Sequence, residues 1–165
     1  MAGFRPSRII YPGSETYTQT ELSAPGTRPL PVSPDPIVKV EETAYILFQI
    51  PDLPKQKAFL EDFGMVTVAH TAERLFMRGF GTDPFIYQAE RGPAARFLGA
   101  GFSVRDAEAL EVLAQRTGQP VERLDTPGGG RRVRLTDPDG FLVDVLNGRE
   151  SVPPLATRRE IGRHV

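Results

Sequence analysis

Few residues in this chain could carry out nucleophilic or metal chemistry. The 165-residue sequence contains no cysteine and two histidines, His70 and His164. Without cysteine there can be no thiolate nucleophile, thiolate metal ligand or disulfide bond. We interpret His70 as an exposed turn residue after a strand and His164 as a residue of the C-terminal tail. No Ser-His-Asp arrangement and no paired-carboxylate spacing is evident, so no catalytic residue is assigned.

The composition argues against several other classes of protein. The 20 basic and 21 acidic residues are mixed along the chain and give a net charge of −1. This distribution provides no electrostatic footprint for nucleic acid or for an anionic membrane. No segment approaches the roughly 18 apolar residues of a membrane span. Because no secretory signal is recognisable either, a cytoplasmic location is expected.

The elements that would position a site form an internal repeat with an offset of 54 residues. Four residues of the first copy, Phe48, Ile50, Asp52 and Gly64, recur in the second copy as Phe102, Val104, Asp106 and Gly118. Self-similarity at a fixed spacing indicates one supersecondary unit used twice. Each unit must then bury an apolar face that it cannot bury alone.

Each copy is predicted to be a βαβββ unit. Apolar and β-branched runs predict strands, and capping residues bound the helices. The first copy is expected to contain a strand at 44–50, a helix from Asp52 to Gly64, and strands at 65–69, 74–78 and 84–88. The second is expected to contain a strand at 97–104, a helix at 106–117, and strands at 121–124, 132–135 and 141–146.

Two local features complete this prediction. In the first helix Phe59, Leu60 and Phe63 are expected to form the buried face. The run of three glycines at 128–130 lies between two strands with no helix after it, which favours a hairpin loop over a phosphate-binding loop.

The predicted fold class is α+β, with two βαβββ repeats pairing into a curved, mainly antiparallel sheet and helices on its outer face. Residues 1–37 contain seven prolines and form an extended N-terminal arm, either disordered or docked on the domain or a partner. Residues 38–148 form the folded module, with repeats at about 44–90 and 96–148. Residues 149–165 form a C-terminal linker or tail.

The duplicated unit, together with the turn Asp137-Pro138-Asp139-Gly140 before the last strand, resembles the vicinal oxygen chelate superfamily. This superfamily includes glyoxalase I, bleomycin-resistance proteins and type I extradiol dioxygenases, and the resemblance covers about residues 38–148. The turn is also reasonable by itself, because proline fixes φ and glycine accepts a positive φ.

The resemblance implies a metal position that this chain does not fill. Metal-dependent members bind one divalent ion, iron(II) or manganese(II) in extradiol enzymes, through the first strand of each copy and the last strand of the second. These positions correspond to Tyr45, Gly99 and Asp144. Glycine has no donor, and a phenol with a pKa of about 10 is a poor ligand at neutral pH. No metal ligand is therefore assigned; the cleft candidates are Tyr45, Tyr87 and Asp144, and simple packing is favoured for Tyr45.

Three functional hypotheses follow from the resemblance. The favoured one is a non-catalytic N-terminal module of an extradiol-type ring-cleaving dioxygenase of aromatic catabolism, acting on a dihydroxylated aromatic compound. Iron(II) or manganese(II) would then reside in a following module. The second is a metal-free protein that binds a small aromatic ligand, as drug-sequestering members do, as a dimer. The third is a structural module or an enzyme of another chemistry. The expected partners are thus a small aromatic ligand and a second module or a homo-oligomer.

Overall fold

The computed structural model describes residues 8–9, 17–18 and 36–156. The chain divides into two units, Met1–Pro36 and Ile37–Val165. In the first unit the strands β1 (Arg8–Ile9) and β2 (Tyr17–Thr18) form an antiparallel pair. Residues 1–7, 10–16 and 19–35 of the predicted N-terminal arm, and His164 in the tail, lie outside the described residues.

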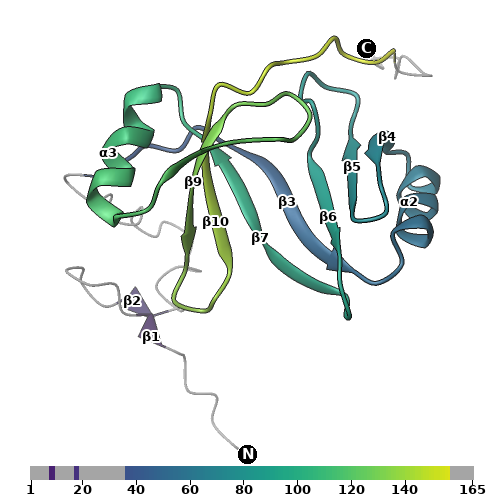
Figure 1. Cartoon of the computed structure of the whole chain (residues 1–165), viewed down its shortest axis with the longest axis horizontal. Helices are drawn as coiled ribbons and strands as arrows, with labels where there is room; N and C mark the ends of the chain where they lie inside the picture. The colour runs from purple at the N-terminus through teal and green to yellow at the C-terminus, as the bar shows by residue number, and fades with distance from the viewer. Residues whose placement is uncertain (1–7, 10–16, 19–35, 157–165) are drawn as a thin grey trace, which may run out of the picture. The chain divides into compact units, whose positions relative to one another are not determined.

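The second unit contains one open sheet of eight strands and two helices (Figure 1). The first repeat comprises β3 (Glu42–Ile50), α2 (Leu53–Asp62), β4 (Val66–His70), β5 (Arg74–Arg78) and β6 (Tyr87–Arg91). The second repeat comprises β7 (Arg96–Ser103), α3 (Ala107–Thr117), β8 (Val121–Arg123), β9 (Arg131–Thr136) and β10 (Leu142–Asn147). The predicted pair of βαβββ units is confirmed.

The order of the strands places the two repeats edge to edge. The order is β4-β5-β6-β3-β7-β10-β9-β8, so the first strands of the two repeats, β3 and β7, lie side by side and antiparallel. Within each repeat the first and last strands pair in parallel, and the other pairs are antiparallel. The three glycines at 128–130 lie in the connection between β8 and β9, as predicted.

Capping residues determine where the helices begin and end. The Asp52 carboxylate accepts a hydrogen bond from the Lys55 N–H at 2.9 Å, which satisfies one of the free donors of the first turn of α2. The helix is followed by Gly64 with φ +104°, and α3 ends at Gly118 with φ +70°. Both glycines adopt the left-handed conformation that ends many helices and that disfavours other residues.

Two details of the prediction are wrong. Leu53 and Leu60 form the buried face of α2, whereas Phe59 and Phe63 are exposed. The prediction missed Leu53 in the first turn. Leu53 and Leu60 are seven residues apart and therefore lie on the same side of the helix, which turns both phenylalanines away from the sheet. The strand expected at 84–88 begins at Tyr87, because Pro84 has no N–H for the ladder and the Phe85 carbonyl accepts from Arg149.

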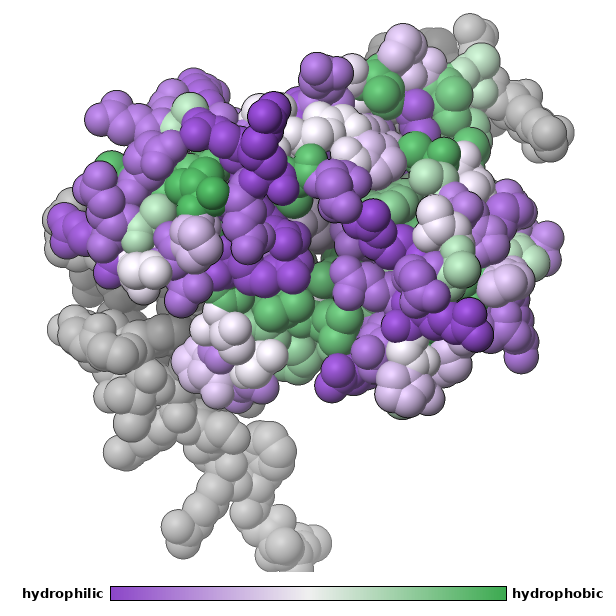
Figure 2. Space-filling view, in the orientation of Figure 1, coloured by the Kyte–Doolittle hydropathy of each residue, from purple (hydrophilic) through white to green (hydrophobic). Residues whose placement is uncertain are grey.

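The two faces of the sheet have different cores. Both helices cover the outer face, where α2 packs on a cluster with Leu75 and Met77, and α3 packs on a cluster with Val133 and Val145. A third cluster, on the opposite or concave face, contains Tyr45 together with Ala44, Phe76, Phe85 and Leu146. Figure 2 shows that hydrophilic residues cover most of the face in view, with hydrophobic residues in smaller areas between them.

Candidate functional site

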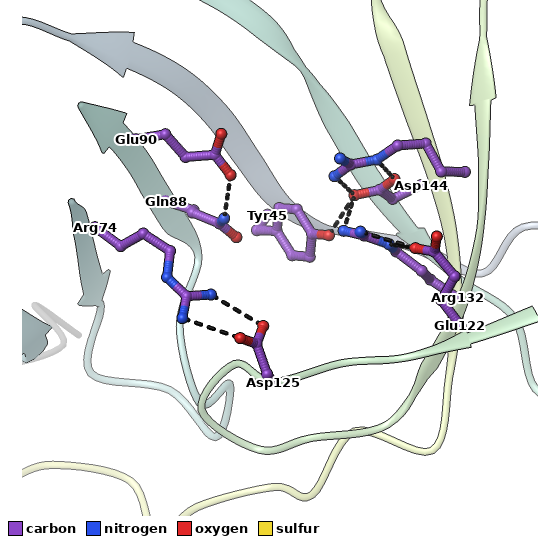
Figure 3. Close-up of polar contacts among 9 residues, drawn as sticks. Tyr45, Arg74, Gln88, Glu90, Glu122, Asp125, Arg132 and Asp144 are labelled. Carbon is purple, nitrogen blue, oxygen red and sulfur yellow. Dashed lines mark hydrogen bonds and ion pairs between the residues drawn. The ribbon is translucent and has the colours of Figure 1, made fainter. Parts of the chain in front are cut away.

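A row of directly opposed residues crosses the middle of the concave face. Tyr45 on β3 pairs with Gly101 on β7, Gly101 with Asp144 on β10, and Asp144 with Arg134 on β9. Directly opposed residues of neighbouring strands point to the same face. The Tyr45 hydroxyl donates to Asp144 Oδ2 at 2.7 Å across the intervening strand (Figure 3).

Gly101 makes this contact possible. A Cβ at this position would lie 2.7 Å from Tyr45 Cζ and 2.9 Å from Leu146 Cδ1. The Tyr45 ring is rigid, and both Tyr45 and Leu146 are buried, so any other side chain at this position would displace the ring. The tyrosine ring can therefore lie over β7 because glycine occupies the position below it.

Asp144 is a buried carboxylate whose two oxygens both accept hydrogen bonds. Its exposed fraction is 1%. Arg134 donates from Nε to Oδ1 at 2.7 Å and from Nη2 to Oδ2 at 2.8 Å, and Arg132 Nη1 lies 3.4 Å from Oδ2. A bidentate guanidinium–carboxylate pair of this kind is strong and fixed in direction. Arg132 is also held by Glu122 at 2.9 Å.

The electrostatics of this cluster favour the ionised form of the Asp144 carboxyl. Burial alone would raise the pKa of the Asp144 carboxyl, but hydrogen bonds from Arg134 and Tyr45 and the charges of Arg134 and Arg132 together lower it. Burial, followed by the Asp144 charge, raises the pKa of the Tyr45 phenol above its ordinary value. At neutral pH the cluster thus contains a neutral phenol, a carboxylate and two guanidinium groups.

The rest of the concave face around Tyr45 is filled by side chains. The Tyr45 ring lies 5.0 Å from that of Phe85, and Leu124, from the connection after β8, packs against the same cluster. The Arg149 guanidinium lies 4.4 Å from the Phe85 ring centre and donates to the carbonyls of Ala44 and Phe85. Four of the better-formed pockets within residues 36–156 are lined by other residues and include neither Tyr45 nor Asp144.

The structure separates the three cleft candidates. Tyr45 and Asp144 are in direct contact, whereas Tyr87 lies on the outer face, where its ring stacks on Phe48 at 5.4 Å. Burial raises the pKa of Tyr87 to about 12. His70 is exposed, as expected, but it is the last residue of β4 and not a turn residue after the strand. Whether any of these residues contacts a substrate stays a prediction.

The residues at the implied metal position do not fit a divalent ion. Gly99 offers no donor, and a Cβ built on it would overlap the Leu142 carbonyl, so a ligating side chain has no room there. Asp144 already binds two guanidinium groups, and their positive charges oppose a cation at the same oxygens. Residues 36–156 contain no cluster of three histidine or carboxylate residues arranged to hold a metal.

Sequence reasoning missed Arg132, Arg134 and Gly101. The alternation Arg132-Val133-Arg134 is a usable signal, because period two in a strand places both arginines on one face and Val133 on the other. Their partnership with Asp144 required the pairing of β9 with β10, which the pattern alone did not give.

The chain matches no protein-family model and no curated protein. Its fold is similar to that of several solved structures. The Mn(II)-bound glyoxalase from Novosphingobium aromaticivorans aligns with a TM-score of 0.65 and 23% identity, over 75% of this chain and 43% of the glyoxalase. Homoprotocatechuate 2,3-dioxygenase from Brevibacterium fuscum, in complex with 3,4-dihydroxyphenylacetate, aligns with a TM-score of 0.64 and 24% identity, over 76% and 42% of the two chains.

These neighbours are a glyoxalase and an extradiol dioxygenase, both of the vicinal oxygen chelate superfamily. The structural resemblance inferred from the sequence is therefore confirmed, and the chain has the vicinal oxygen chelate fold. It spans less than half the length of these neighbours. Among the described residues, no helix is long and apolar enough to cross a lipid bilayer.

Proposed function

We propose that this chain is a metal-free, non-catalytic module of an extradiol-type ring-cleaving dioxygenase, located in the cytoplasm. A further module would hold iron(II) or manganese(II) and act on a dihydroxylated aromatic compound. The observation that carries this proposal is the state of Asp144, whose oxygens are occupied by Tyr45 and Arg134. In this role the module contributes packing and shape to the assembly, and the chemistry takes place elsewhere.

The likeness to the neighbours supports a module of this size. The chain aligns with 36% of an extradiol ring-cleaving dioxygenase from B. fuscum at a TM-score of 0.61 and 24% identity. The alternative, capture of a small aromatic molecule on the concave face, has less support, because Phe85, Leu124 and Arg149 already pack against Tyr45.

The test combines metal binding with ring cleavage. Titration of the purified chain with manganese(II), and anaerobically with iron(II), should give no stoichiometric binding by calorimetry. The chain should not convert 3,4-dihydroxyphenylacetate in the presence of either metal and dioxygen. Stoichiometric binding that Asp144→Asn abolishes would overturn the proposal. The intact mass of the natural protein provides a separate check, because a mature protein of 18.2 kDa would leave no room for a metal-bearing module.

A further inference from the structure

Helix α2 and the residue that caps its C-terminal end present two large aromatic side chains to solvent. Phe59 and Phe63, one turn apart, are 60% and 79% exposed, and their rings stack with centres 6.4 Å apart. Exposed apolar residues that occur singly are ordinary, but a contiguous aromatic patch marks an interaction surface. At the positions 54 residues further on, in the second repeat, α3 has Leu113, which is buried, and Thr117, which is polar.

Phe59 and Phe63 themselves line one side of a groove of about 630 Å³. Its floor and far wall come from the outer face of the sheet, where the apolar side chains are Ile46, Phe48, Ile86 and Phe97. Three of these, Ile46, Ile86 and Phe97, are themselves more than one third exposed. The patch therefore combines a protruding pair of rings with an adjacent apolar depression.

We propose that two copies of this chain associate through this face, with Phe63 of each copy inserted into the groove of the other. A two-fold dimer brings the same surface of both copies together, so the surface must contain both the protruding and the receiving part. The patch on α2 meets this condition. The inference does not depend on the proposed function, because it involves none of the residues around Asp144.

Charges beside the patch are complementary under the same symmetry. Asp62 is adjacent to Phe63 on α2, and Arg96 lines the groove beside Phe97. Neither charge takes part in an ion pair with another residue of the 36–156 segment, although Arg96 Nε donates to Gln49 Oε1 at 3.0 Å. When Phe63 enters the partner's groove, Asp62 approaches the partner's Arg96, and the two-fold axis generates this pair twice. Such pairs at the edge of an interface contribute to specificity and to the rate of association.

A small molecule fits this groove less well than a second copy. Small-molecule sites enclose most of the ligand surface. Here the side chain that forms the outer wall, Phe63, is itself 79% exposed, so a bound small molecule would remain largely in contact with water. A protein surface that covers Phe63 and the groove together removes both from water.

Sedimentation velocity of the full chain over a wide range of concentration tests the proposal. The wild-type protein should sediment as a dimer at high concentration, and Phe63→Ser should raise the dissociation constant at least about tenfold, the equivalent of roughly 1.4 kcal/mol. Phe80→Ser is the matched control, because Phe80 is 41% exposed and lies outside the groove. It should leave the dimer intact. Circular dichroism should show both variants folded.

Charge reversal tests the arrangement of the two copies. Asp62→Arg and Arg96→Asp should each weaken the dimer, and the double variant should restore it. A wild-type protein that remains monomeric at every concentration would overturn the proposal. So would a dimer that Phe63→Ser leaves unchanged, because association would then use another face.

Discussion

The last two strands of each repeat carry the same pair of charges on the concave face. In the second repeat Asp144 lies opposite Arg134, and in the first repeat Glu90 lies opposite Arg74. Asp144 and Arg134 form a bidentate ion pair. Glu90 instead accepts from the Gln88 amide at 3.1 Å, as Figure 3 shows.

The second repeat also supplies the partner of Arg74. Its guanidinium pairs with Asp125, from the connection after β8, at 2.9 and 3.0 Å. The same pair of charges thus forms an internal ion pair in one repeat and a bridge between repeats in the other. The two carboxylates differ in their surroundings: Tyr45 and two arginines enclose Asp144, whereas Glu90 remains in contact with water. Position in the sheet therefore determines which charges face each other, and burial determines which of them pair.

Removing the Asp144 charge should have the largest effect on stability. Asp144→Asn leaves the Arg134 guanidinium partly buried without its counter-ion, which should lower the free energy of unfolding by about 3 kcal/mol. Glu90→Gln is the matched change in the first repeat and should cost less than about 1 kcal/mol. Urea denaturation at neutral pH measures both. Equal losses would show that the two repeats use their carboxylates in the same way.

Acid should remove the stabilisation that the ionised Asp144 carboxylate provides. Because the pKa of Asp144 is lowered in the folded state, its ionised form stabilises the protein above the unfolded-state pKa of about 3.9. This stabilisation is lost as the pH falls from that value through the lower pKa of the folded state. Urea denaturation over a pH series should therefore show wild type and Asp144→Asn converging in acid. A constant difference down to the lowest pH would contradict the assignment.

Adding a methyl group at Gly101 should have the next largest effect. Gly101→Ala places a Cβ against the Tyr45 ring and should cost about 1–3 kcal/mol through overpacking. Gly81→Ala is the control, because a Cβ there has no atom within 4 Å. Thermal unfolding compares the two. Replacing Tyr45 by leucine should recover part of the loss at Gly101, and no recovery would show that the clash lies elsewhere.

Much of the fold could be predicted from the sequence because the repeat is visible in it. Matching residues such as Asp52 and Asp106, or Gly64 and Gly118, occur at the same place in each unit and bound the two helices. Periodicity was less successful in predicting which face of a helix is buried. It failed for α2, where tertiary packing buries Leu53 and Leu60 and leaves Phe59 exposed.

The polar cluster was much less accessible to sequence reasoning. A single strand shows which side chains share a face, but not which strand lies beside it. Tyr45 and Asp144 are 99 residues apart and meet because β7 separates them with a glycine at the crossing point. That meeting depends on the order of four strands, which no local pattern specifies.

The smallest predicted effect concerns the ion pair between Arg74 and Asp125, which joins the two repeats. Its geometry is bidentate, but Asp125 is largely exposed, so water and salt screen the attraction between the charges. Arg74→Gln should therefore lower the free energy of unfolding by only about 0.5 kcal/mol, and added salt should abolish most of that difference. A double-mutant cycle with Asp125→Asn, followed by urea denaturation at low and high ionic strength, isolates the pair. A coupling energy that persists at high salt would mean that the connection after β8 depends on this pair. Two other contacts also hold this connection and argue against that result. They are the packing of Leu124 and the hydrogen bond from the Glu150 N–H to the Gly128 carbonyl.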